Sequence, residues 1–339
     1  FFSLVSTSLI ASDKLDTNNY SFFFKHLVYV LIGIIIIFIF SSFNTNQLFK
    51  YSIFLFFVSL FSLLLVPIIG IEVKGSKRWI DLFFLPRFQP IEVLKPFLII
   101  TLATILCSNK ANIFSKHLIS IFIIALISLL LIIQPDIGQT LLVLFSWTVL
   151  IFTSGINLYL LISIFLFGSL FLAYLIIFVP KFDYIQGRIF SFFNRETGSH
   201  NFQSDKAIDS ITSGGFFGKG MGEGTLKNSV PEAHTDYIIS VISEEFGVVA
   251  IMLILLLFLM FIYMVFKKIN FETNDKIKLI LIGSISLILM QATIHIGVNI
   301  RLFPTTGMTL PFLSYGGSSI VSTSILAGII LNLTKRKIN

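Results

Sequence analysis

The stretch PEAHTD, Pro231 to Asp236, lies at the boundary between a long polar segment and a long apolar one. Residues 181–236 are polar and rich in glycine, whereas residues 237–266 are mostly apolar. An apolar run of about 20 residues can cross the hydrocarbon core of a bilayer as a helix. The stretch therefore predicts an acid, Asp236, at the mouth of a transmembrane helix, and a charge there suggests chemistry on a lipid-linked substrate.

The composition of the whole chain indicates the same class. Of 339 residues, 55% are hydrophobic and 12% are charged, and the mean hydropathy is +0.94, which is too apolar for a soluble domain. The net charge of +7 does not indicate nucleic-acid binding, because many Lys and Arg flank apolar spans and no basic soluble module is present. A single cysteine, Cys107, excludes an intrachain disulfide and a multi-cysteine zinc site.

Apolar runs of spanning length recur along the chain. Phe1–Ala11 is apolar but too short to span, and we expect it to be the end of a truncated first helix. The sequence thus predicts an all-α polytopic membrane protein with about ten transmembrane helices, forming one membrane domain over 1–339 with a large extracytoplasmic loop at 181–236. The other nine runs are 26–43, 51–71, 91–108, 117–133, 140–155, 157–180, 237–266, 278–298 and 317–333.

Lysine and arginine set the expected orientation. With ten spans both ends lie on one side, and the terminal Lys335-Arg336-Lys337 places that side in the cytoplasm. The inner loops carry 10 Lys and Arg and the outer loops 13, but 6 of those 13 lie in the long loop 181–236. Long loops contribute little to this rule, so the count favours the same orientation.

The glycine-rich segment 214–224 of that loop allows two interpretations. It resembles a phosphate cradle, in which backbone amides and Lys219 would bind a pyrophosphate. However, Gly218-Lys219 is followed by Gly220 rather than Ser or Thr, and no G-x-G-x-x-G follows a strand. The alternative is a close-packed re-entrant turn that uses the conformational freedom of glycine.

Polar residues at helical spacing follow Asp236. Ser240, Ser243, Glu244 and Gly247 continue its stripe at intervals of three and four, so they share one face of the predicted helix. Ionisable groups in a membrane helix normally line an interior or a water-filled path. Glu244 and its neighbour Glu245 are therefore expected to pair with basic groups, whereas the position of Asp236 favours a functional role.

Two further segments carry charge into the membrane. Glu92 and Lys95 are three residues apart at the start of a helix, where they can pair with each other or form a site. Asp136 interrupts another apolar run and could cap a helix or line the same cavity.

Five motifs in order resemble the signatures of the shape, elongation, division and sporulation (SEDS) family over nearly the whole chain. Within the family, Ala233 and Gly307–Pro311 are more similar to the cell-division members than to the elongation members. The motifs are Gly75–Asp81, Gln89-Pro90 with Glu92 and Lys95, Gln134–Gly138, Pro231–Asp236 with Glu244-Glu245, and Pro311–Ser319.

The resemblance implies a peptidoglycan glycosyltransferase that polymerises lipid II at the outer face of the bacterial cytoplasmic (inner) membrane, for septal wall synthesis. It also implies a class B penicillin-binding protein and other divisome membrane proteins as partners. In that family the acid matching Asp236 is essential, and a carboxylate there can take the proton from the acceptor hydroxyl. Direct displacement with one carboxylate predicts inversion at the anomeric carbon.

The leaving undecaprenyl pyrophosphate requires cationic stabilisation. Arg78, Lys95, Arg188 and Lys219 are candidates, and a divalent cation such as Mg²⁺ or Mn²⁺ could share that role. The remaining substrate-binding candidates that the resemblance implies are Gln89, Glu92, Asp136, Gln203, Glu223, His234, Thr235, Ser314 and Tyr315.

Some residues depart from the family pattern, and some functions stay open. Ile91 stands where the family usually has a small polar residue, and Phe202 stands where Tyr is usual. Arg301 occupies a position that is commonly small, and it is expected to contact a lipid headgroup. Ser314–Ser319 lacks G-x-S-x-G, so we expect a helix-entry turn that caps the last span rather than a serine nucleophile. A lipid II flippase or other transporter, a structural divisome scaffold and an elongation-type polymerase remain alternatives.

Overall fold

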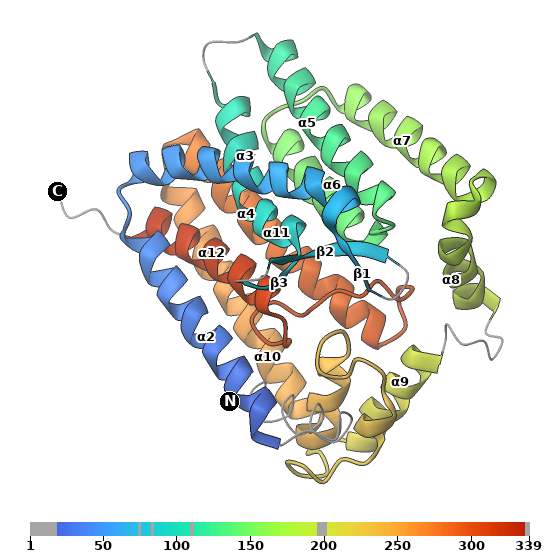
Figure 1. Cartoon of the computed structure of the whole chain (residues 1–339). Coiled ribbons are helices and arrows are strands. Elements are labelled where there is room, and N and C mark those ends of the chain that lie inside the picture. Colours follow the sequence, from blue (N-terminus) through green and yellow to red (C-terminus); the bar gives the residue numbers. More distant parts are fainter. Residues whose placement is uncertain (1–18, 74–75, 83–84, 109–111, 195–201, 336–339) are drawn as a thin grey trace. The chain divides into compact units, whose positions relative to one another are not determined.

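The computed structural model describes residues 19–73, 76–82, 85–108, 112–194 and 202–335 (Figure 1). Contacts divide the chain into two compact units. The loop unit comprises Phe1–Phe23, Gly155–Leu256 and Ala292–Ser314, and the core unit comprises Phe24–Ser154, Leu257–Gln291 and Tyr315–Asn339. The chain passes from one unit to the other within three helices, α2 (Asn19–Ser42), α10 (Ile238–Phe271) and α11 (Asp275–Asn299), and also at residues 154–155 and 314–315.

Long apolar helices dominate both units, which confirms the all-α polytopic class. Seven of the described helices are long and apolar enough to cross a membrane, and α6 is apolar but shorter, at 17 residues. The truncated first helix predicted for residues 1–11 lies outside the described residues. The helices that match predicted spans are α2 (Asn19–Ser42), α3 (Thr45–Ile69), α4 (Pro90–Leu106), α5 (Ile113–Ile133), α6 (Ile137–Thr153), α7 (Leu158–Phe178), α10 (Ile238–Phe271), α11 (Asp275–Asn299) and α12 (Gly317–Thr334).

Their surfaces fit a lipid environment. In the most apolar 18-residue stretch of α7, only 6% of the residues are buried within the protein, and in that of α2 only 11% are. Both helices are nevertheless rich in Phe, Ile and Leu. Helices that are apolar on all sides and remain uncovered are stable in hydrocarbon, not in water. The exposed apolar faces therefore belong against lipid.

Helix α4 forms the centre of the core unit. It packs against α3, α5, α6 and α12, and most of its side chains are buried, including Glu92 and Lys95. Pro90 begins the helix, where its missing N–H leaves no intrahelical partner unsatisfied. The charged pair is thus placed one turn inside a helix that is surrounded by other helices.

A small antiparallel sheet precedes α4, between the predicted spans 51–71 and 91–108. Its strands are β1 (Ile71–Val73), β2 (Ser76–Leu82) and β3 (Leu85–Phe88), in the order β1-β2-β3. Aromatic and β-branched residues such as Trp79 and Ile80 favour the strand conformation, and Ile80 is buried. The sheet positions Arg78, which lies on β2.

The loop 181–236 is largely helical. It contains η1 (Pro180–Phe182), α8 (Asp183–Asn194), α9 (Phe202–Gly214) and η2 (Leu226–Ser229). The buried face of α9 consists of small residues, Ser204, Ala207, Ser210 and Gly214. These allow close approach: a Cβ at Gly214 would lie 2.0 Å from the Ser243 carbonyl oxygen of α10.

Helix α10 is not the uninterrupted span that the sequence predicted. Gly247 has φ 75° and ψ −178°, so the helix breaks there. Only glycine adopts this backbone conformation without large strain. The break separates a buried, polar first part from an apolar second part.

Candidate functional site

Asp236 stands just before the first turn of α10, in the loop unit. Its backbone N–H donates to the Glu232 carbonyl at 3.0 Å, and Glu232 has a positive φ of 54°. Asn299, at the end of α11, donates from its side-chain amide to the Asp236 carbonyl at 3.1 Å and to the His295 carbonyl at 2.8 Å. The Asn299 amide oxygen accepts from the Ser240 N–H at 3.3 Å. One buried side chain therefore holds the backbone on both sides of the start of α10.

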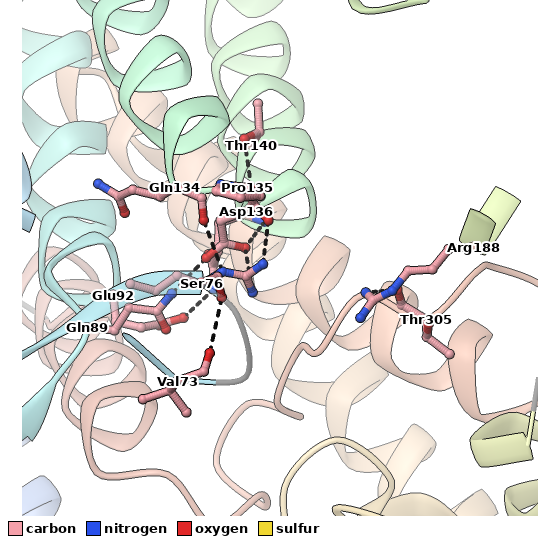
Figure 2. A network of polar contacts seen from close by, with 12 residues as sticks. Val73, Ser76, Gln89, Glu92, Gln134, Pro135, Asp136, Thr140, Arg188 and Thr305 are labelled. Atoms are coloured by element: carbon pink, nitrogen blue, oxygen red, sulfur yellow. Dashed lines mark hydrogen bonds and ion pairs between the residues drawn. The ribbon is translucent and has the colours of Figure 1, made fainter. Parts of the chain in front are cut away.

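The segment 305–307 brings a cation and the acid into one neighbourhood. The Arg188 side chain of α8 donates to the Thr305 carbonyl at 2.9 Å, as Figure 2 shows. Two residues later, Gly307 has φ 71°, and a Cβ there would lie 3.6 Å from Asp236 Oδ2. The predicted catalytic acid and one predicted pyrophosphate ligand are thus both placed against the same short segment.

Tyr237, next to Asp236, is almost fully buried. Burial raises its pKa above the usual value for tyrosine, the negative charge of Asp236 raises it further, and the Arg188 charge opposes this shift. The Tyr237 hydroxyl is therefore a neutral donor, and it has no hydrogen-bond partner among the described residues. Sequence reasoning did not identify it.

Ser314 supports the acid motif, and the segment Ser314–Ser319 enters the last helix as predicted. Its hydroxyl donates to the Thr235 carbonyl at 2.7 Å and accepts from the Leu310 N–H at 2.7 Å. The residue that caps α12 is Gly316, without a side-chain cap bond. The helix-entry turn is therefore present, and its first serine is hydrogen-bonded to the PEAHTD turn.

Glu244 lies fully buried in the polar part of α10. Its carboxylate accepts from the Ser210 hydroxyl at 2.9 Å and the Leu226 N–H at 2.9 Å, and forms an ion pair with Lys219 at 3.3 Å. This supports the expectation that the acid pairs with a basic group. Lys219, a predicted pyrophosphate ligand, is thereby engaged by a carboxylate.

The glycine-rich loop packs against α10. Gly215, Gly218, Gly220 and Gly222 have positive φ angles, and the Gly222 N–H donates to a Glu245 carboxylate oxygen at 3.2 Å. A Cβ at Gly218 would lie 2.2 Å from the Glu245 carbonyl oxygen. This geometry supports the close-packed interpretation of the loop, because backbone N–H groups of the loop that a phosphate would need are hydrogen-bonded to α10.

A second polar network lies in the core unit. Lys95 Nζ is 2.9 Å from Glu92 Oε2 and donates to the side-chain oxygens of Gln139 at 3.1 Å and Gln291 at 3.4 Å. The Gln139 amide donates to the other Glu92 oxygen at 2.6 Å. Glu92 and Lys95 therefore pair with each other, one of the two possibilities that their spacing allowed, and two glutamines from other helices complete the network.

Asp136 links this unit's sheet to the start of α6 (Figure 2). It caps α6 by accepting from the Gln139 N–H, and it accepts from the Gln89 amide at 2.8 Å. Arg78 lies 3.8 Å from the carboxylate and donates to the carbonyls of Gln134 and Pro135. The structure thus brings together three predicted residues, Arg78, Gln89 and Asp136, and confirms the cap.

The remaining predicted residues take less central positions. Tyr315 makes edge-to-face ring contacts with His26 and Tyr29 in the core unit. Gln203 is half-buried in the first turn of α9, and Glu223 is exposed in the glycine-rich loop. His234 is half-buried in the PEAHTD turn. Arg301 pairs with Asp205 rather than being free for the predicted headgroup contact.

The described residues contain no cluster of metal-ligating side chains. Among them, no three His, Cys, Asp or Glu side chains are grouped so that they could hold a metal ion. A divalent cation held by one or two carboxylates together with a substrate pyrophosphate would not require such a group.

Comparisons with known proteins agree along the whole chain. The FtsW/RodA/SpoVE model, described as "Cell cycle protein", matches residues 1–339. A protein of Coxiella burnetii named "Probable peptidoglycan glycosyltransferase FtsW" is 32% identical, covering 97% of this chain and 91% of that protein. A protein of the same name from Haemophilus influenzae is 29% identical, covering 98% and 85%.

Solved structures show the same fold. One, described as "Structural coordination of polymerization and crosslinking by a peptidoglycan synthase complex", superimposes with a TM-score of 0.77 at 25% identity, covering 98% of this chain and 94% of that one. The rod shape determining protein RodA of Thermus thermophilus superimposes with a TM-score of 0.70 at 26% identity, covering 98% and 93%.

Proposed function

Because the chain belongs to the FtsW/RodA/SpoVE family of cell cycle proteins, we infer that it is a peptidoglycan glycosyltransferase that polymerises lipid II at the outer face of the cytoplasmic membrane. Its multi-pass helical architecture suits a substrate with a membrane-embedded tail. The relatives named FtsW favour a role in septal wall synthesis, and the SEDS family inferred from the sequence motifs is confirmed.

The observation that carries the proposed mechanism is the placement of Asp236 and Arg188 against the segment 305–307. A glycosyl transfer from a lipid pyrophosphate needs a base for the acceptor and positive charge for the leaving group. An acid at the start of a membrane helix, beside a cation from a separate helix, provides both kinds of group. Of the four predicted cations, Arg188 is the one that lies in the loop unit and also contacts the segment 305–307, which lies against Asp236.

In this mechanism Asp236 is the general base. Its carboxylate accepts the proton of the acceptor sugar hydroxyl while the hydroxyl oxygen attacks the anomeric carbon of a second lipid II. The bond from that carbon to the pyrophosphate oxygen breaks, and undecaprenyl pyrophosphate leaves with the electron pair. A single displacement inverts the anomeric configuration. Asn299 holds the Asp236 backbone and thereby fixes the position from which the Asp236 carboxylate extends.

The other predicted cations have different surroundings. Lys95 is fully buried against Glu92, and Lys219 is paired with Glu244. Arg78 is held by Asp136 and two backbone carbonyls. We assign Arg188 the main role in stabilising the leaving pyrophosphate, because it contacts the same segment 305–307 as Asp236. We propose that the rest organise their own elements.

A divalent cation that assists the reaction would be held mainly by the substrate pyrophosphate, because among the described residues no three His, Cys, Asp or Glu side chains are grouped to hold one. No step of the mechanism is assigned to it. The partner we propose is a class B penicillin-binding protein that crosslinks the product, at the division septum together with other divisome proteins. The similar solved chain belongs to a peptidoglycan synthase complex, which supports a synthase partner.

Lipid II conversion in liposomes tests this proposal against a transporter. The full-length protein is reconstituted with its partner and supplied with fluorescent lipid II in both leaflets. A polymerase yields long glycan strands that a muramidase digests, and the amount of product follows the lipid II of the outward leaflet. Movement of lipid II between leaflets without strands would contradict the proposal and identify a flippase.

A further inference from the structure

The break in α10 exposes backbone groups that a continuous helix would pair internally. In an uninterrupted α-helix, the N–H groups of Val248 and Val249 would donate to the carbonyls of Glu244 and Glu245. The backbone of Gly247 prevents both bonds. Two donors and two acceptors therefore need partners from outside the helix.

The glycine-rich loop supplies all four partners. The N–H groups of Lys219 and Gly220 donate to the carbonyls of Glu244 and Glu245 at 2.9 and 3.0 Å. In return, Val248 N–H donates to the Gly215 carbonyl at 3.0 Å, and Val249 N–H donates to the Phe216 carbonyl at 3.2 Å. The loop is thus inserted into the break, and its backbone takes the place of a helical turn. Irregular backbone is tolerated at membrane depth when it is paired in this way.

The depth of the break in the membrane follows from the length of α10 between Gly247 and Lys267. Residues 248–266 are 19 consecutive residues without a charge, and Lys267-Lys268 follow. At about 1.5 Å per residue this run is about 28 Å long, close to the thickness of about 30 Å of a bilayer's hydrocarbon core. With the two lysines at the inner boundary, Gly247 lies at the outer boundary of the hydrocarbon.

The tip of the loop carries two large apolar side chains at that level. Phe216 and Phe217 are 75% and 84% exposed, and the Phe216 backbone is bonded to Val249. Val249 and Met252, on the apolar part of α10, are themselves 51% and 61% exposed. The phenylalanines therefore extend a surface that already faces lipid along α10.

We propose that Phe216 and Phe217 insert into the acyl chains of the outer leaflet and anchor the loop 214–222 at the hydrocarbon boundary. The loop is then a membrane-inserted element and not a water-exposed one. Because it is bonded to both sides of the break, the anchor also fixes the height of the polar part of α10, at whose outer end Asp236 stands. The insertion itself does not rest on the proposed function, since it involves no substrate.

Spin-label accessibility tests the proposal without an activity measurement. Cys107 is replaced by serine, and a nitroxide is attached to Phe217→Cys in the full-length protein, reconstituted in vesicles of phosphatidylethanolamine and phosphatidylglycerol. Collision with oxygen, which concentrates in acyl chains, is compared with collision with a water-soluble nickel chelate. Met252→Cys provides the lipid-facing reference, and the exposed Asp209→Cys on α9 provides the aqueous one.

The expected result is a ratio of oxygen to nickel accessibility at 217 that matches the Met252 reference. A ratio that matches the Asp209 reference would overturn the proposal. Low accessibility to both reagents would also overturn it, because it would mean that protein covers the tip. A second label at Phe216→Cys must agree, and since both side chains are exposed, neither replacement removes packing within the fold.

Discussion

Removing the positive charge of the buried Glu92–Lys95 pair should strongly destabilise the protein. Lys95 is fully buried, and its ammonium group contacts one carboxylate and two amide oxygens, of Gln139 and Gln291. In Lys95→Met the side chain keeps a similar volume, so little cavity forms. Glu92 would then be a buried carboxylate that keeps the Gln139 amide as a donor but has lost its positive partner.

The expected loss in unfolding free energy is about 3–5 kcal/mol, the usual result of breaking a buried ion pair by removing one partner. Replacing both charges should cost much less, because buried pairs are often no better than apolar or neutral groups of similar size. In Glu92→Gln/Lys95→Met the new amide can still accept from Gln139. The double variant should therefore recover most of the loss.

The assay is reversible unfolding in mixed detergent micelles, with SDS as the denaturant and circular dichroism as the signal. Wild type, Glu92→Gln, Lys95→Met and the double variant form a double-mutant cycle. We expect a coupling energy of about 2 kcal/mol or more between the two positions. Additive effects of the two substitutions, or a loss below about 1 kcal/mol for Lys95→Met, would refute it.

Four other outcomes follow from single contacts. Asn299→Leu should lower kcat by up to about 10²-fold with little change in KM, because Asp236 loses its positioning bond; an unchanged kcat would contradict this role. Gly247→Ala should destabilise the fold by about 1–3 kcal/mol from backbone strain alone. The new Cβ would also lie 2.2 Å from the Phe216 carbonyl oxygen, so equal melting temperatures for the variant and wild type would disprove this expectation. Tyr237→Phe should raise the unfolding free energy by about 1–3 kcal/mol, since its hydroxyl is unpaired among the described residues; a loss of stability would reveal a partner. The free protein should leave the Mn²⁺ spectrum in electron paramagnetic resonance unchanged, and a bound-ion signal without substrate would show a protein site.

The sequence predicted the membrane helices well because the signal is local. A run such as 157–180 is so apolar that its length alone determines the element, and α7 occupies Leu158–Phe178. Helix ends were less accurate: α10 extends to Phe271, past the predicted end at 266, because Lys267 and Lys268 continue the helix beyond the apolar run. Spacing also revealed the Glu92–Lys95 pair, since residues three apart on a helix must be neighbours.

The features that were missed depend on contacts between distant segments. The break at Gly247 could not be seen in the apolar pattern, because the loop that pairs its backbone lies about 30 residues earlier. Asn299 shares a face with His295, four residues before it, but nothing in that spacing shows that it reaches Asp236. Nothing in the segment Ser314–Ser319 shows that Ser314 bonds to the Thr235 carbonyl, which lies 79 residues earlier in the sequence.

The most direct test of the central claim is the rate of glycan polymerisation by Asp236→Asn compared with wild type, with lipid II and the partner protein saturating. Asparagine keeps the size of the side chain and the backbone bonds to Asn299 and Glu232, but it cannot accept the proton. A folded variant that binds lipid II and the partner as wild type does, yet makes no strands, is the predicted result. Strands made at the wild-type rate would show that Asp236 is not the base.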